Sequence, residues 1–221
     1  MNVLRLGRIS AILWLLAMTL FALPLAAEGA ASQTQAPPMV VFRPPSKEEL
    51  AEIAKPELRA ELLRLAAADQ QARLVGGCGD EEADSEEAAA NVEAVDQVNT
   101  ARLQELIEQH GWPTVAMVGS DGARAAWLLV QHADHALEFQ QRCLELMIAH
   151  VESEQADRID VAYLTDRVRV NEGRPQLYGT QFYWSEGKRV PQPIEDPDSV
   201  DERRKGLGMR TLRSYSKFVN T

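Results

Sequence analysis

Hydrophobic residues after position 55 recur at intervals of three and four, which places them on one face of an α-helix. Ser46 followed by Glu49 has the pattern of a capping box, so an earlier helix is predicted to begin at Ser46 and to restart at Pro56. The spacing predicts helices over residues 56–73, 85–107, 138–149, 159–168, 201–205 and 207–219. A further helix is predicted to begin near residue 121.

The pattern changes between residues 176 and 194. Residues 176–184 are aromatic and rich in β-forming side chains, and residues 185–188 supply a turn. Residues 189–194 can return as a second strand, whose prolines keep it at a sheet edge. We therefore predict a mainly α fold of the α+β class, a compact domain of about five to seven helices with one small C-terminal antiparallel β-hairpin.

The first 27 residues have the order of a secretory signal peptide. Arg5 and Arg8 form a positive start, an apolar run extends from Ile9 to Leu25, and small residues follow. We predict cleavage and export to the periplasm or the extracellular space, with no stable membrane insertion afterwards. Because the apolar run is long for a signal peptide, an uncleaved N-terminal membrane anchor is the alternative.

Composition divides the remaining chain into a tail and one domain. Residues 28–45 contain four prolines among small and polar residues, which is typical of a semi-extended tether. Residues 46–221 are predicted to form a single helical domain with an acidic loop near 76–84.

The formal net charge of −10 argues against binding to nucleic acid, because both surfaces would be negative. Eight acidic residues lie between positions 80 and 96, and no Lys or Arg occurs between Arg73 and Arg102. From Asp166 onward, eleven basic residues outnumber eight acidic ones, so an anion-binding surface is expected in the C-terminal third.

Two cysteines, Cys78 and Cys143, remain after the predicted export. An oxidising compartment permits a disulfide between them. Cys143 shares a helical stripe with Phe139, Leu146 and Met147, which instead indicates a buried small hydrophobe. Both alternatives stay open at this stage.

His132 is the strongest candidate for acid–base chemistry. With Leu129 at the centre of a helical projection, small residues form a narrow packing face, His132 lies at its edge and His135 lies towards solvent. His132 is predicted either to act as a catalytic acid or base or to hydrogen-bond a neighbouring segment for structure. The i, i+3 pair of histidines has no third metal ligand at a recognisable spacing, so we predict no metal and no cofactor.

Polar side chains crowd the predicted junction between the helix over 159–168 and the following strand. Amide, hydroxyl, carboxylate and guanidinium groups on rigid elements are suited to orienting a polar ligand, and Gly179 allows a close backbone approach. The alternative is an internal hydrogen-bond network that holds the hairpin on the helices. The candidate ligand-binding residues here are Asp166, Arg167, Gln176, Tyr178, Thr180 and Gln181.

Two further candidates follow the hairpin. Asp196 could serve as a carboxylate base and Arg203 as an anion clamp. The alternative is that Asp196-Pro197 forms a turn and that the arginine covers a solvated helix.

The chain contains no G-x-S-x-G, P-loop, G-x-G-x-x-G or H-E-x-x-H motif. It does carry Gly111-Trp112-Pro113, a run from Ala125 to Asp134, Tyr163 to Arg167, and Gln176 to Phe182. From about Asp69 to the C-terminus these strings resemble an uncharacterised bacterial family, a domain of unknown function. The resemblance implies a shared fold and no particular activity. Its polar positions include His132, Asp134, Gln140, Asp166, Arg167, Gln176, Tyr178, Thr180, Gln181, Asp196 and Arg203.

The function expected from the sequence is an exported cell-envelope domain. A polar pocket between the His132 helix and residues 178–181 would bind a small polar or peptide-like ligand and could hydrolyse it with an activated water. The alternative is a noncatalytic envelope module that binds a protein partner, in which the polar cluster is internal scaffolding.

Overall fold

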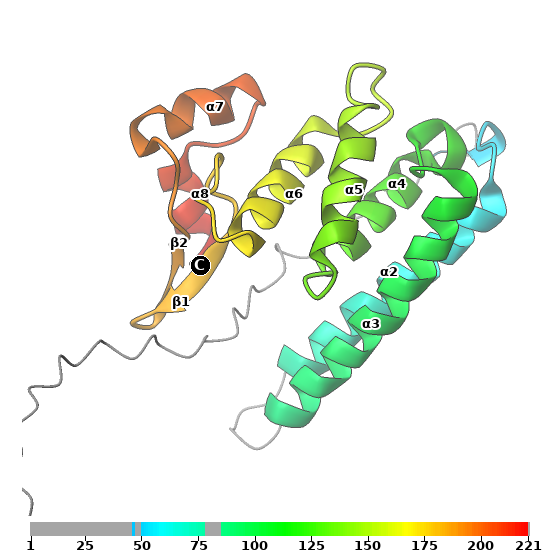
Figure 1. The fold of residues 1–221 in the computed structure, drawn as a ribbon, viewed down its shortest axis with the longest axis horizontal. Coiled ribbons are helices and arrows are strands. Elements are labelled where there is room, and N and C mark those ends of the chain that lie inside the picture. The colour runs from blue at the N-terminus through cyan, green and yellow to red at the C-terminus, as the bar shows by residue number, and fades with distance from the viewer. Residues whose placement is uncertain (1–45, 47–49, 78–84, 221) are drawn as a thin grey trace, which may run out of the picture. The chain divides into compact units, whose positions relative to one another are not determined.

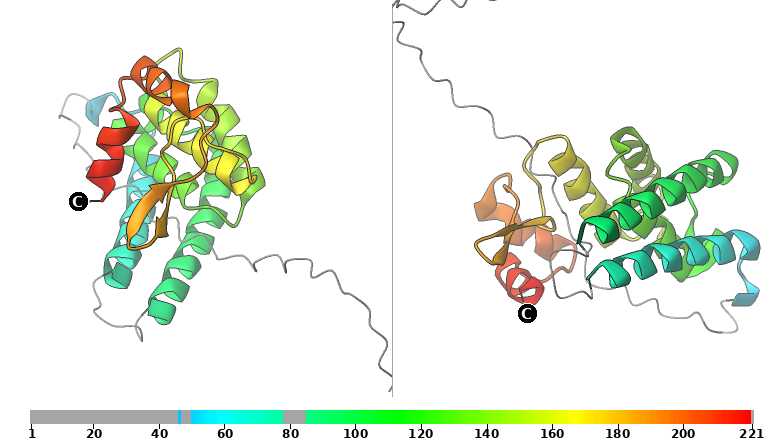
Figure 2. Two further views of the ribbon diagram at one scale, coloured as in Figure 1. Left: turned by 90° about the vertical axis from the view of Figure 1, so that its left-hand side faces the viewer. Right: turned by 90° about the horizontal axis from the view of Figure 1, so that it is seen from below.

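Two long helices, α2 (Pro56–Gly77) and α3 (Ser85–His110), lie side by side and pack against each other (Figures 1 and 2). The computed structural model describes residue 46 and residues 50–77 and 85–220, all within one compact unit. Pro56 begins α2, as predicted, because a first-turn proline sacrifices no helical hydrogen bond. Leu62 of α2 and Leu103 of α3 are fully buried and contribute to the shared core.

Helix α4 (Val115–Gln131) is the central element of the core and packs against α2, α3, α5 and α6. It bends at Gly119, where φ is +73°, so the predicted start near Asp121 corresponds to the segment after the bend. All residues from Ala125 to Gln131 are buried. The predicted narrow small-residue face is therefore wrong, because neighbouring helices surround this helix on every side. The helix also ends at Gln131, so the predicted face does not continue beyond this residue.

Helices α5 (Leu137–Ile148) and α6 (Arg158–Asn171) pack against each other and against α4 (Figure 1). Asp157 caps α6, since its carboxylate accepts hydrogen bonds from the backbone N–H groups of Ile159 and Asp160. Cys143 is fully buried in the core, as its helical stripe indicated. Burial raises the pKa of its thiol to about 12, and Cys78 lies outside the described residues.

The C-terminal part holds the predicted antiparallel hairpin, formed by β1 (Phe182–Ser185) and β2 (Lys188–Pro191). Its strands are shorter than predicted, because Gln176 and Ile194 meet only as an isolated bridge. A 3-10 turn η1 (Pro197–Ser199) leads into α7 (Val200–Gly206), and α8 (Leu212–Val219) closes the chain. The helix predicted over 207–219 begins only at Leu212, since Gly208 has a φ of +71° that no α-helix contains.

Seven α-helices and one two-stranded hairpin in the described residues confirm the predicted mainly α, α+β fold. The predicted signal peptide at 1–27, the tail at 28–45 and most of the acidic loop lie outside these residues. The helix predicted from Ser46 is described only in part, where the N–H of Leu50 donates to the carbonyl of Ser46. None of the described helices combines the length and apolar character needed to cross a membrane.

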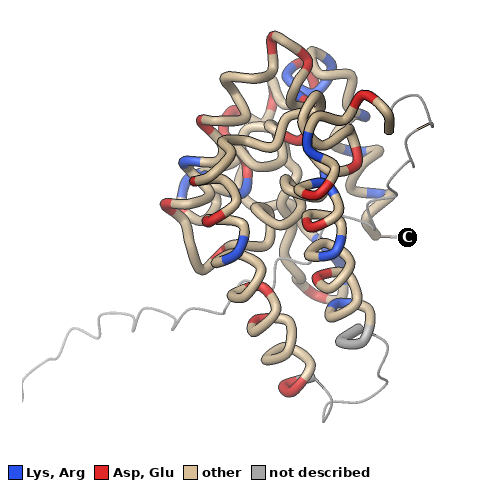
Figure 3. Tube along the Cα trace, turned by 90° about the vertical axis from the view of Figure 1, so that its right-hand side faces the viewer, with Lys and Arg blue, Asp and Glu red and all other residues tan. Residues whose placement is uncertain are grey.

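Charged positions of both signs lie close together along most of the described helices (Figure 3). The first half of α3 differs, because it carries Glu86, Glu87, Glu93 and Asp96 and no basic residue before Arg102. The acidic segment noted in the sequence therefore continues from the undescribed loop into a regular helix.

Candidate functional site

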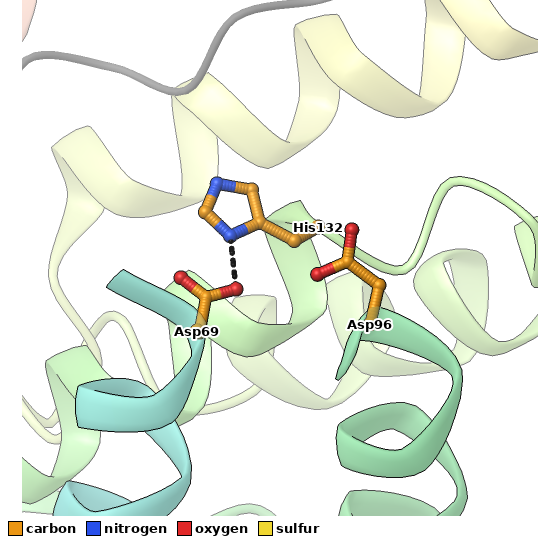
Figure 4. Close-up of side chains that lie close together, drawn as sticks. All are labelled: Asp69, Asp96 and His132. Atoms are coloured by element: carbon orange, nitrogen blue, oxygen red, sulfur yellow. Dashed lines mark hydrogen bonds and ion pairs between the residues drawn. The ribbon is translucent and has the colours of Figure 1, made fainter. Parts of the chain in front are cut away.

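His132 lies at the C-terminal cap of α4, and its imidazole reaches Asp69 of α2 (Figure 4). The distance between His132 Nδ1 and Asp69 Oδ1 is 2.7 Å. Asp69 is fully buried and His132 is only 4% exposed. His132 therefore lies inside the protein at the end of α4, whereas the prediction placed it at the edge of the packing face of a continuing helix.

Arg73 joins this pair to a second carboxylate on α3. One guanidinium nitrogen of Arg73 lies 3.0 Å from Asp69, four residues earlier on the same helix. The guanidinium also donates three hydrogen bonds to Asp96, with distances of 2.9 to 3.0 Å. A neutral imidazole, two carboxylates and one guanidinium thus connect α2, α3 and α4, and the positive charge is shared between the carboxylates.

Burial lowers the pKa of His132 more than the hydrogen bond and charge of Asp69 raise it. Burial alone would raise the pKa of Asp69, but the hydrogen bond from His132 and the charge of Arg73 outweigh it, so this pKa is lowered. Desolvation raises the pKa of Asp96 despite its contacts with Arg73. At neutral pH, the His132 Nδ1–H therefore donates to an ionised Asp69 carboxylate.

This tautomer leaves the second ring nitrogen of His132 as a hydrogen-bond acceptor. Nε2 is buried and has no hydrogen-bond partner in the described part of the chain. Figure 4 shows that it lies on the far side of the ring from Asp69 and Asp96. A carboxylate-oriented imidazole with an unpaired Nε2 has the hydrogen-bonding arrangement of a general base, and in this structure the atom is closed to solvent.

The same group has the composition of a metal site. One ligand atom each from Asp69, Asp96 and His132 lies within 4.8 Å of the others. However, Arg73 already occupies both carboxylates, and a divalent cation would have to displace this guanidinium. The arrangement therefore favours an internal charge network with a free base over a metal centre, and His135 is exposed and takes no part in it.

Sequence reasoning missed Asp69, Arg73 and Asp96. A signal was present, because Asp69 falls on the apolar stripe that Leu62, Leu65 and Ala66 define on α2. An acidic residue on a buried helical face requires a partner, since an unpaired buried charge is costly. The sequence could not show that this partner is His132, because the pairing depends on how α2 packs against α4.

The carboxylate of Asp166 on α6 binds the backbone of residues 177–180, at the predicted junction between helix and strand. Its carboxylate accepts hydrogen bonds from the N–H groups of Leu177, Tyr178 and Thr180, and from the Thr180 hydroxyl, over 2.6 to 3.1 Å. Asp166 is fully buried, and desolvation raises its pKa although these donors oppose the shift. The carboxylate thus holds this turn on α6.

Arg167, also on α6, connects three segments. It donates two hydrogen bonds to Asp134 and one to the side chain of Gln181, at 2.7 to 3.0 Å. Gln176 is fully buried, and its side chain bonds the backbone of Gln181 and Gln192. The structure therefore brings together Asp166, Arg167, Gln176, Thr180 and Gln181, whose side chains hydrogen-bond one another and neighbouring protein groups.

The remaining candidates border this network. Arg203 of α7 donates to the carbonyl oxygens of Leu177, Glu195 and Asp196, so it supports the loop after the hairpin. Asp196 is exposed and has a φ of +46°. Tyr178 is half-buried, and its carbonyl accepts a hydrogen bond from Arg204. The link between the network and the His132 group passes through Asp134, two residues after His132.

The fold and these two polar groups define a mainly helical α+β domain with a buried Asp–His pair. Residues 56–221 match the model of a family described as a family of unknown function (DUF6624), and the chain belongs to this family. No curated protein and no solved structure gave a match. The resemblance noted in the sequence is thus confirmed at the level of the family.

Proposed function

We propose that this protein is an exported cell-envelope domain that binds a small polar ligand and hydrolyses it with His132 as the general base. The observation that supports this most directly is the buried, unpartnered Nε2 of an imidazole whose other nitrogen is held by Asp69. Nε2 would take a proton from a water molecule as the water oxygen attacks the ligand, and the imidazolium would return this proton to the leaving group as the scissile bond breaks. Asp69 is then a positioning residue that selects the reactive tautomer and stabilises the imidazolium.

Arg167 is the residue proposed to orient an anionic group of the ligand. Its charge already acts on His132, because it contributes to lowering the pKa of the imidazole. Asp166, Gln176, Tyr178, Thr180, Gln181, Asp196 and Arg203 would shape the polar surroundings of the ligand. Since Arg167 is bound to Asp134 and Gln181, ligand binding would have to exchange one of these contacts for a new one.

The test is hydrolysis of ester, amide and phosphate-ester substrates by the purified domain. We expect His132→Gln to abolish turnover, whereas His135→Gln, which changes an exposed histidine three residues away, retains it. Asp69→Asn should lower kcat and shift its pH profile, a readout that a purely structural role would not move. Equal turnover in the wild type and His132→Gln would exclude the catalytic role.

The localisation is tested separately. Fractionation of expressing cells followed by intact-mass measurement should give a chain that begins after residue 27 in the exported fraction. A full-length chain in the membrane fraction would support the N-terminal anchor instead.

A second candidate function is a noncatalytic envelope module that binds a protein partner. It is favoured by the internal hydrogen bonds of Asp166, Gln176 and Thr180, which stabilise the hairpin on α6. If no substrate is hydrolysed and the His132→Gln and Gln181→Ala variants lose several degrees in Tm, this scaffolding role is the better account.

A further inference from the structure

A cavity of about 320 Å³ lies at the N-terminal part of α4, away from the residues of the proposed hydrolytic site. Ser120, Ala123, Arg124 and Trp127 line it from one face of α4, with the spacing of a single helical stripe. The opposite wall comes from the end of α5, the connection to α6 and the first turn of α6. Neither His132 nor any other predicted site residue lines it.

Part of the lining of this cavity is apolar. Trp112, Trp127, Met147 and Val151 contribute rings and aliphatic groups to its walls. Trp112, Trp127 and Met147 are almost completely buried, so these walls are held in place by the core. The volume is at the lower end of small-molecule sites, which span about 300 to 1,000 Å³. The shape and lining suit one apolar side chain of moderate size.

Arg124 supplies a positioned cation at the cavity. Its guanidinium lies 4.7 Å from the centre of the Trp127 ring, and Nη1 donates to Asp160 at 2.5 Å. Within the described residues, its remaining nitrogens make no hydrogen bond, and the side chain is 37% exposed. The cation–π contact with Trp127 and the hydrogen bond to Asp160 hold the guanidinium in place, so its free donors are pre-organised for a carboxylate.

Two of the three carboxylates at the cavity already have partners, and the third has none in the described part of the chain. Asp157 is occupied by the N–H groups of the first turn of α6, and Asp160 is paired with Arg124. Glu154 is exposed and makes no side-chain hydrogen bond or ion pair in the described part of the chain. Its backbone has a φ of +57°, a conformation in which glycine would be favoured over glutamate. Glu154 is thus the available anion, on a different segment from Arg124.

We infer that this cavity binds a free α-amino acid with an apolar side chain. The carboxylate of the amino acid pairs with Arg124, its ammonium group pairs with Glu154, and its side chain enters the space between Trp112 and Trp127. Arg158 also lines the cavity and is exposed, so the rim carries two cations, Arg124 and Arg158, and the available anion Glu154. A zwitterion offers a carboxylate to the guanidinium groups and an ammonium to Glu154, whereas a simple acid or a simple amine matches only one of these signs. This site is independent of the proposed hydrolytic function.

The test is calorimetric titration of the full chain without its first 27 residues against leucine, methionine, phenylalanine and tryptophan. At least one of these should bind saturably. N-acetylphenylalanine, which lacks the ammonium charge, and phenethylamine, which lacks the carboxylate, should bind about tenfold or more weakly than phenylalanine. Absence of saturable binding for all four amino acids, or binding of either analogue as tight as that of phenylalanine, would overturn the inference.

Matched variants locate the site. Arg124→Gln and Glu154→Gln should each weaken binding about tenfold or more, since each removes one charge-assisted contact. Arg142→Gln and Glu152→Gln change nearby exposed residues outside the cavity lining and should bind like the wild type. His132→Gln should also bind normally, so failure of the hydrolytic proposal is distinguishable from failure of this one. Unchanged affinity in both Arg124→Gln and Glu154→Gln would place any bound amino acid elsewhere and refute the assignment.

Discussion

His132 and Asp69 are 63 residues apart in the sequence, yet His132 Nδ1 and Asp69 Oδ1 are separated by only 2.7 Å inside the protein. The contact joins the end of α4 to the middle of α2, and Arg73 extends it to α3. Because both partners are buried, the imidazole of His132 is harder to protonate in the folded state than in the unfolded state. The pair therefore contributes to the pH dependence of stability.

Between pH 7.5 and 5.5, the wild type should lose stability relative to His132→Gln as the pH falls. The pKa of His132 is lowered in the folded state, so below about 6.5 the unfolded chain binds a proton that the folded chain does not. This group alone changes the free energy of unfolding by up to about 1.4 kcal/mol per pH unit. Urea denaturation of the wild type and His132→Gln at both pH values measures it.

In this window the slope of stability against pH should be less positive in the variant than in the wild type. The variant should also show a general loss of about 1–3 kcal/mol, because Asp69 loses its imidazole partner. His135→Gln is the control and should retain the wild-type slope, because His135 is exposed. Asp69 does not interfere, since its lowered pKa affects stability only at more acidic pH. A wild-type slope in His132→Gln would contradict this account.

Asp160 should contribute a slope of the opposite sign. Burial raises its pKa to about 7, so between about pH 4 and 7 the folded chain binds a proton that the unfolded chain has lost. Relative to the wild type, Asp160→Asn should therefore become more stable as the pH rises from 5 to 7, by up to about 1.4 kcal/mol per pH unit. The measurement is the difference in the free energy of unfolding between the two proteins at each pH.

Asp157→Asn provides a contrast for this experiment, because Asp157 is exposed and caps α6 rather than pairing with Arg124. It should lower stability by about 1 kcal/mol or less without the same pH trend. If Asp160→Asn has the same pH dependence as the wild type, Asp160 is ionised throughout this range.

Asp166→Asn should destabilise the domain by about 2–4 kcal/mol. The carboxylate accepts from three backbone N–H groups and a hydroxyl, whereas an asparagine amide presents one oxygen and directs an NH₂ group at the same donors. Chemical denaturation measures the loss. Asp198→Asn, at an exposed position after the hairpin, should change stability by less than about 0.5 kcal/mol. Equal effects of the two substitutions would show that the Asp166 contacts contribute little.

Gly179→Ala tests how closely the backbone at residue 179 approaches Leu212, the first residue of α8. Gly179 has a φ of +68°, and an added Cβ would lie 2.7 Å from Leu212 and 3.1 Å from Ile194. Gly173 has a similar φ of +73° but open space around it, so Gly173→Ala measures the backbone strain alone. Thermal denaturation should show a loss of about 1 kcal/mol for Gly173→Ala and about 2–4 kcal/mol for Gly179→Ala. Similar losses would mean that Leu212 moves aside without cost.

The sequence by itself determined the class of fold, since hydrophobic spacing and local capping act within a few residues of each other. Helices α2, α3, α5 and α6 and the C-terminal hairpin follow from such local signals, although the strand lengths do not. It also identified His132, Asp166, Arg167, Gln176 and Gln181 as polar residues in otherwise apolar or structured segments.

Only the tertiary structure decided which of these residues meet. The partners of His132 come from α2, and the rim of the cavity combines Arg124 of α4 with Glu154 after α5. Such pairings depend on how helices pack across the core, because distant side chains become neighbours only when their apolar faces are buried together. The periodicity of one segment contains no information about the register of another, and that register places the charges.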